Sequence, residues 1–133
     1  MTHADIADAR RLWASVEGVE LAEGDAPEEI ARYLARNSAL STVAVADDGR
    51  LLGAVLCGHD GRRGFVYHLA VDAAHRGEGI GRAVMQRSLN ALKAEGVKRV
   101  LLLVSVENAG GEMFWRREGW GEMSFAKPMG IDL

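Results

Sequence analysis

Two segments near the start of the chain repeat apolar residues at the spacing of an amphipathic helix. Residues 4–17 place four apolar side chains on one helical stripe, namely Ile6, Ala9, Trp13 and Val16. Residues 26–37 carry a second inward-facing set, namely Ile30, Tyr33 and Leu34. Asp25 and Pro27 stand where this second helix would begin, because proline suits the first helical turn. The pattern therefore predicts two helices before any strand.

Three apolar segments rich in strand-forming residues follow, at residues 41–46, 50–58 and 65–71. The sequence Asp-Asp-Gly at 47–49 separates the first two segments and is typical of a hairpin turn. A second glycine-rich turn, at residues 58–64, separates the second segment from the third. The pattern predicts a meander of antiparallel strands.

A long helical pattern and further elements follow the meander. Residues 80–96 predict a helix that ends at a glycine. Residues 100–106 are apolar at all but one position, which favours a strand covered on both faces. Residues 110–119 predict a short helix, and residues 120–129 a last strand. The order ααβββαβαβ over residues 1–133 indicates a single α/β domain.

Composition narrows the class of protein. The chain has 133 residues, 48% of them hydrophobic and 26% charged, as in an ordinary globular domain. Its net charge of −3 argues against a nucleic-acid binder, which needs a basic face. Cys57 is the single cysteine, so no internal disulfide can form and a reducing compartment fits best. The charged start of the chain and its short apolar runs lead us to expect a cytoplasmic protein without a membrane partner.

The sequence HRGEGIG, residues 75–81, lies where a predicted strand gives way to a predicted helix. The first N–H groups of a helix have no intrahelical partner, and the helix dipole makes that end partly positive. Gly77, Gly79 and Gly81 remove side chains that would block an anion, and Arg76 adds a fixed positive charge. The stretch therefore predicts a phosphate-binding loop rather than a plain turn.

Two common phosphate motifs do not fit this loop. A dinucleotide fingerprint that starts at Gly77 would need a sixth-position glycine where the chain has Arg82. A P-loop would need Gly-Lys-Ser/Thr, whereas Gly81 precedes Arg82 and Ala83. A nucleotide-binding module of another kind stays as an alternative.

The pattern R-x-x-G-x-G at residues 76–81 resembles the pyrophosphate loop of the GNAT family of acyl-CoA N-acyltransferases. Asn108 followed by FWRREGW at residues 114–120 is similar to a later signature of that family. The order of the predicted elements also agrees over nearly the whole chain. Two motifs at the right separation make the resemblance specific.

The resemblance implies the GNAT fold, a single mixed and mostly antiparallel twisted sheet flanked by helices. Its two central strands, residues 65–71 and 100–106, would splay apart, and the arm of acetyl-CoA, a co-substrate, would lie between them. The residues implied to bind acetyl-CoA are Leu69, Ala70, Val71, Arg76, Gly77, Glu78, Gly79, Ile80, Gly81, Arg82, Asn108 and Trp115.

The sequence departs from the family at Trp115, where a tyrosine that protonates the leaving CoA thiolate is usual. An indole N–H donates hydrogen bonds but is no useful general acid. A thiol with a pKa of about 8.5 leaves fairly well without a proton, so we expect catalysis by positioning. Tyr67 is a substitute donor. Asn108 also suits a helix N-cap, and Trp115 also suits aromatic packing.

Direct attack on a thioester needs a neutral amine, so a base or a water chain has to take its proton. The sequence offers several carboxylates and one histidine on the expected acceptor side, namely Glu17, Glu20, His59 and Asp60. His68 lies on the strand next to the acyl group, but strand alternation puts it on the opposite face from Leu69. Asp60-Gly61 is also a strong turn signal. None of the four histidines is spaced like a metal ligand, so no metal is expected.

Three hypotheses follow. The first is an acetyl-CoA-dependent N-acetyltransferase that transfers an acetyl group directly to a primary amine of a small molecule or peptide. The second is a non-catalytic acyl-CoA binder on the same fold, suggested by Trp115. The third is the nucleotide module. Because residues 121–133 leave little room for the family's last strands, the acceptor side would be open or completed by a homodimer partner.

Overall fold

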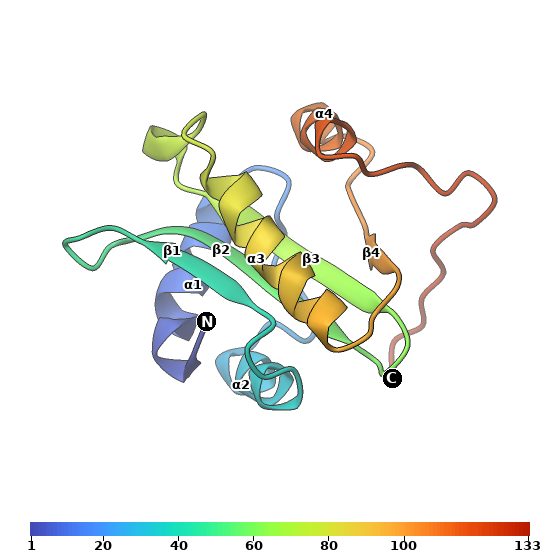
Figure 1. Ribbon diagram of the computed structural model, residues 1–133, viewed down its shortest axis with the longest axis horizontal. Coiled ribbons are helices and arrows are strands. Elements are labelled where there is room, and N and C mark those ends of the chain that lie inside the picture. Colours follow the sequence, from blue (N-terminus) through green and yellow to red (C-terminus); the bar gives the residue numbers. More distant parts are fainter.

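A computed structural model describes residues 1–133 as one open sheet with helices on both faces (Figure 1). The chain begins with the 3-10 helix η1 (His3–Asp5) and the helices α1 (Ile6–Ser15) and α2 (Pro27–Arg36). The strands are β1 (Thr42–Val45), β2 (Leu51–His59), β3 (Gly64–Val71) and β4 (Val100–Leu102). Between β3 and β4 lie the 3-10 helix η2 (Ala73–His75) and α3 (Ile80–Ala94), and α4 (Ala109–Arg117) follows β4.

The strands lie in the order β1-β2-β3-β4. β1 pairs with β2 and β2 with β3 in antiparallel fashion, whereas β3 and β4 run parallel. Parallel pairing joins Gly64–Val66 to Val100–Leu102 and goes no further, although β3 continues to Val71. The predicted splay of the central strands is confirmed, as are the α/β class and the mostly antiparallel mixed sheet.

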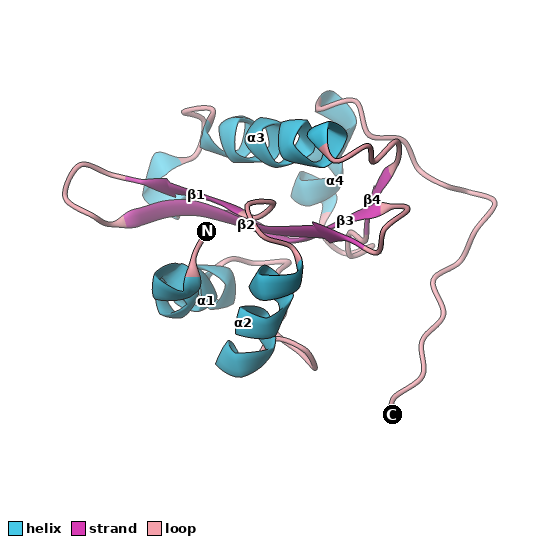
Figure 2. Cartoon of the chain, turned by 60° about the horizontal axis from the view of Figure 1, so that its bottom comes forward, coloured by secondary structure: helices cyan, strands magenta, loops and turns pink.

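Each face of the sheet has its own core. α1 and α2 cover one face (Figure 2), where Trp13 and Ile30 pack against Ala54 and Ala70 of β2 and β3. α3 covers the other face, where its Leu92 packs with residues of β2 and β3 that include Cys57 and Val66. The alternation of the two sets along β2 matches the predicted strand periodicity. No helix is long and apolar enough to cross a membrane.

The C-terminal part of the chain differs from its prediction. The strand predicted at 100–106 ends at Leu102, and Leu103 and Val106 are 72% and 97% exposed rather than covered. The last strand predicted at 120–129 does not form, and the chain beyond α4 runs away from the sheet as irregular structure (Figure 1). Strands persist where neighbouring backbones satisfy their N–H and C=O groups, and no strand pairs with the outer edge of β4.

Candidate functional site

The loop between β3 and α3 carries bare backbone with room beside it. It runs from η2 to the start of α3 at Ile80. Gly77 and Gly79 have φ angles of 81° and 80°, in the left-handed region that favours glycine. A Cβ atom added at either position would meet no atom within 4 Å. A ligand can therefore approach the main chain here without meeting a side chain.

The backbone N–H groups from Arg76 to Arg82 all lack a partner inside the chain. Those before Ile80 donate no hydrogen bond, and the first intrahelical bond of α3 runs from the Ala83 N–H to the Gly79 carbonyl. α3 is 15 residues long, so its dipole adds partial positive charge at this end. Arg76 is exposed and forms no ion pair within the chain. We call residues 76–82 the cradle, because they combine donors without a partner with open space beside Gly77 and Gly79.

Two further glycines let neighbouring elements approach the start of α3. Gly81 is buried, and a Cβ there would lie 3.4 Å from the ring of Phe114 in α4. Gly53 of β2 lies against Ile80, and a Cβ there would come within 2.7 Å of Ile80 Cγ2. The sequence pattern of β2 does not by itself single out Gly53. A lone glycine inside an apolar strand was the available signal, since it often marks a close approach.

Two cradle side chains are engaged within the chain. The guanidinium of Arg82 donates hydrogen bonds to both carboxylate oxygens of Glu118, at the end of α4, at 3.0–3.1 Å. This pair raises the pKa of Arg82 and ties the first turn of α3 to α4. Glu78 lies 3.0 Å from His75 Nδ1. Arg76 is therefore the cradle cation that stays available to an anion.

The edge of β3 beyond Val66 faces the gap left by β4. β2 pairs with the opposite edge as far as Val71, whereas the pairing with β4 stops at Val66. The segment Leu69–Val71 therefore has one edge without a neighbouring strand, next to the cradle. An extended ligand arm can add to such an edge through main-chain hydrogen bonds.

The pairing of β2 with β3 contains a bulge at His68. Ala54 pairs with Ala70 and Leu56 with Tyr67, so β3 contains one more residue than β2 between these two pairs. His68 has a φ of 52°, unusual for a residue other than glycine. Its Nε2 atom lies 2.8 Å from Oδ1 of Asp25, in the segment between α1 and α2. In the sequence, Asp25 predicts only the start of α2, and nothing there connects it with His68.

Two of the predicted base candidates, His59 and Asp60, already form hydrogen bonds within the chain. His59 Nε2 lies 2.6 Å from Glu95 just after α3, and its Nδ1 accepts a backbone N–H of the β2–β3 turn. Asp60 accepts hydrogen bonds from the backbone N–H groups of Arg63 and Arg62, which lower the pKa of its carboxyl. These contacts organise the turn, and they make His59 and Asp60 weaker candidates for a base.

The other two candidates are exposed on the segment between α1 and α2. Glu17 and Glu20 are both exposed, and neither forms an ion pair. This segment touches the start of α4, because Gly18 packs so closely on the Asn108 side chain that a Cβ would clash. Asn108 itself caps α4, since its Oδ1 accepts the Gly111 N–H at 2.9 Å. The capping role expected for Asn108 is confirmed.

The chain matches the Acetyltransferase (GNAT) family over residues 6–120, a range that includes the cradle, the gap and α4. It belongs to the GNAT family. The chain is 38% identical over 85 residues to a mycothiol acetyltransferase of Beutenbergia cavernae, covering 63% of this chain and 29% of that protein. It is 31% identical over 111 residues to N-alpha-acetyltransferase 30 of Schizosaccharomyces pombe, covering 76% and 73%. It thus spans under a third of the first relative and about three quarters of the second.

Solved structures show the same fold. Ard1 of Thermoplasma volcanium superposes with a TM-score of 0.77 at 19% identity, covering 90% of this chain and 78% of that one. Rv2747 of Mycobacterium tuberculosis, solved in complex with CoA, superposes with a TM-score of 0.72 at 24% identity, covering 92% and 69%. These likenesses confirm the GNAT fold predicted from the sequence.

Trp115 of this GNAT chain is part of an aromatic cluster. Its ring lies 5.0 Å from that of Phe114 and 5.3 Å from that of Trp120, both edge-to-face. It also packs against the core on the α3 side of the sheet. The packing role expected for Trp115 is confirmed, while its contact with a cofactor stays a prediction.

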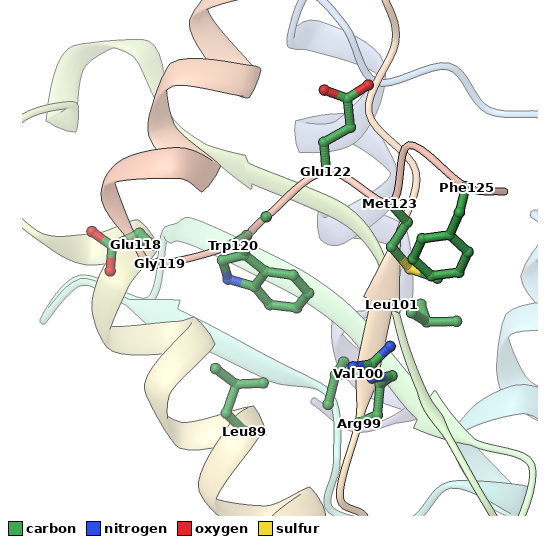
Figure 3. A pocket seen from close by; sticks show the side chains of 11 residues that line it. Leu89, Arg99, Val100, Leu101, Glu118, Gly119, Trp120, Glu122, Met123 and Phe125 are labelled. Atoms are coloured by element: carbon green, nitrogen blue, oxygen red, sulfur yellow. The ribbon is translucent and has the colours of Figure 1, made fainter. Parts of the chain in front are cut away.

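A hollow of about 480 Å³ lies on the other side of β4 from the gap. It opens between α3, β4 and the chain that follows α4 (Figure 3). Its lining residues are Leu89, Arg99, Val100, Leu101, Glu118, Gly119, Trp120, Gly121, Glu122, Met123 and Phe125. None of these belongs to the cradle. The hollow is lined in part by residues of the segment 120–129, where the sequence predicts the last strand.

Proposed function

We propose that this GNAT chain is an N-acetyltransferase that takes an acetyl group from acetyl-CoA and transfers it directly to a primary amine. The observation that carries the proposal is the cradle, a run of unpartnered backbone N–H groups at the positive end of α3. Charge-assisted hydrogen bonds to such donors contribute about 1.5–3 kcal/mol each. A diphosphate supplies enough oxygens to use several of them at once.

The chemistry of the site fits acetyl-CoA along its length. The cradle amides and Arg76 would hold the diphosphate, and the open edge of Leu69–Val71 would bond to the amide-containing arm of the cofactor. Bound acetyl-CoA supplies an activated thioester. The protein supplies position, which contributes about 7–11 kcal/mol when the reacting groups are held in register.

The two named relatives carry names that point to different acceptors, so the acceptor here is proposed only as a primary amine of a small molecule or a peptide. Release of the thiolate needs no acid from Trp115, because a thiol with a pKa of about 8.5 is already a fair leaving group.

A second function is an acyl-CoA binder without transferase activity. It is favoured by Trp115, whose indole cannot protonate a thiolate and whose packing in an aromatic cluster needs no ligand. The two functions share the cradle and differ only in whether an amine reacts.

Two experiments separate these functions. Isothermal titration calorimetry with acetyl-CoA, CoA and ATP tests the cradle, and we expect binding of both CoA compounds without binding of ATP. Thiol release from acetyl-CoA is then followed with a panel of peptide, polyamine, amino acid and aminoglycoside amines. Amine-dependent thiol release supports the transferase. Binding of acetyl-CoA without thiol release from any amine supports the non-catalytic binder, and binding of ATP alone refutes both.

A further inference from the structure

The bulge in β3 turns two successive side chains to the same face of the sheet. Tyr67 lies edge-to-face with Tyr33 of α2, at 6.2 Å between ring centroids. His68 lies 5.3 Å from Trp13 of α1. Regular alternation would send one of the two to the α3 side. The left-handed φ of His68 stores local strain, and such strain recurs at functional sites where the surrounding structure holds it.

The carboxylate of Asp25 fixes the orientation of the His68 ring. Asp25 Oδ1 lies 2.8 Å from His68 Nε2, and its Oδ2 accepts the Ala22 N–H at 2.9 Å. Arg10 Nε donates to the backbone carbonyl of Asp25 at 2.9 Å, which anchors the segment to α1. The side chains of His68 and Asp25 are only 16% and 11% exposed. The pair is therefore held from α1, from the segment between the helices and from β3.

In a neutral imidazole, the contact with Asp25 leaves Nδ1 as the ring nitrogen that can accept a proton. An ionised carboxylate only accepts hydrogen bonds, so Nε2 carries the proton that Asp25 receives. Nδ1 then keeps its lone pair. Nδ1 makes no hydrogen bond within the chain, and no buried side-chain nitrogen or oxygen lacks a partner, so Nδ1 reaches solvent. A neutral imidazole with an oriented N–H and an open lone pair is the arrangement of a general base.

His68 also lies where the reaction would take place. It is two residues past Val66, where β3 and β4 part, and one residue before Leu69 on the edge that faces the gap. Each of the other base candidates either has its polar atoms engaged in the β2–β3 turn or lies exposed in the segment between α1 and α2.

We infer that His68 is the catalytic base that takes the proton of the incoming amine, with Asp25 as its positioning residue. The inference rests on the proposed transferase function. The ammonium form of the acceptor gives one proton to Nδ1 of His68, directly or through one water. The neutral amine nitrogen bonds to the acyl carbon, the carbon–sulfur bond breaks, and CoA leaves as a thiolate. The amide nitrogen releases its second proton to solvent, His68 also returns its proton to solvent, and the thiolate takes up one proton from solvent, so one proton is released in each turnover.

The test compares His68→Asn and Asp25→Asn with wild type and with His3→Asn as a matched control. Asparagine tolerates the left-handed φ at position 68 better than most residues, but its amide is not a base. We expect His68→Asn to lower kcat by about 10²–10⁴-fold with unchanged affinity for acetyl-CoA. We expect a smaller loss for Asp25→Asn and none for His3→Asn, with the best amine of the panel as acceptor.

The pH dependence separates a base from a structural residue. Other titratable groups around His68 are Asp25, Arg10 through the Asp25 carbonyl, and Tyr67, whose ring lies 6.4 Å away. The loss in His68→Asn should shrink as pH rises toward the pKa of the acceptor, because neutral amine then forms in solution. It should also be smaller for a weakly basic amine than for a strongly basic one. A loss of equal size at every pH and with every amine would overturn the inference.

A readout without turnover is the ring tautomer of His68, measured by ¹⁵N NMR on the free protein labelled at histidine. We expect the Nε2–H tautomer, lost selectively in Asp25→Asn. The Nδ1–H tautomer in wild type would overturn the inference whatever the activity. A wild-type rate in His68→Asn overturns the base and leaves the transferase standing. Absence of thiol release by wild type with every amine refutes the transferase, and the base with it.

Discussion

The cradle is best tested by one methyl group placed at Gly79, with the same change at Gly49 as its control. Gly79 and Gly49 have φ angles of 80° and 88°, and a Cβ at either would meet no atom within 4 Å. Gly49 lies in the turn between β1 and β2. Alanine in the left-handed region costs about 1–2 kcal/mol, so both variants should lose about that much stability and no more. Urea titrations should give similar free energies of unfolding for the two.

The variants should differ only in ligand binding. The added methyl of Gly79→Ala occupies the open space through which a phosphate would approach the unpartnered N–H groups. Loss of one charge-assisted hydrogen bond of about 1.5–3 kcal/mol raises Kd by about 10- to 150-fold. Gly49→Ala should bind acetyl-CoA like wild type.

Calorimetry at a temperature where both variants are fully folded measures the difference. The decisive quantity is the ratio of the two dissociation constants, because the shared backbone strain cancels in it. Equal affinity of Gly79→Ala and Gly49→Ala for acetyl-CoA would show that the diphosphate does not bind to the cradle. The observation that supports the proposed function would then be refuted.

Three other changes test separate parts of the structure. Gly53→Ala should destabilise the fold by about 1–3 kcal/mol, because its Cβ would lie 2.7 Å from Ile80 Cγ2; a wild-type urea midpoint would contradict this packing. Trp115→Phe should leave kcat largely unchanged, and a loss on the order of 10³-fold with intact acetyl-CoA affinity would show that an acid acts there. Burial raises the pKa of Cys57 from 9.0 to about 12, so the unfolded chain loses its thiol proton first and stability falls as pH rises through this window. Between pH 9 and 10, below the ordinary pKa of Tyr33, Cys57→Ala should show a flatter fall in the free energy of unfolding than wild type, and parallel curves would contradict it.

Features of local origin could be predicted from the sequence. The position of the cradle can be predicted from three glycines and one arginine beside the start of a helix. These residues are local in the sequence, and they leave the first N–H groups of the helix uncovered by side chains. The helices and the antiparallel meander follow from apolar periodicity. The capping role of Asn108 follows from the preference of asparagine for that position.

Features that depend on distant partners could not be predicted. No residue near His68 predicts a bulge in the sequence. The bulge is visible only in the pairing of β2 with β3, where the register shifts by one residue. Asp25 reads as a helix start until the fold brings it to His68, 43 residues away. Leu103 and Val106 look like core residues of a strand, yet they are exposed because no neighbouring strand pairs with that part of the chain.

The short parallel pairing of β3 with β4 has a mechanical consequence. Three residue pairs at one end of the gap are the only strand pairing that β4 makes with the sheet. At the open end, two polar and partly exposed contacts connect the segments: the Arg82–Glu118 ion pair and the packing of Gly18 on Asn108. Contacts of this kind break at a low cost in free energy. A ligand that contacted both β3 and β4 would hold the two strands at a fixed separation. Its binding would slow amide hydrogen exchange in α4, because β4 leads directly into that helix.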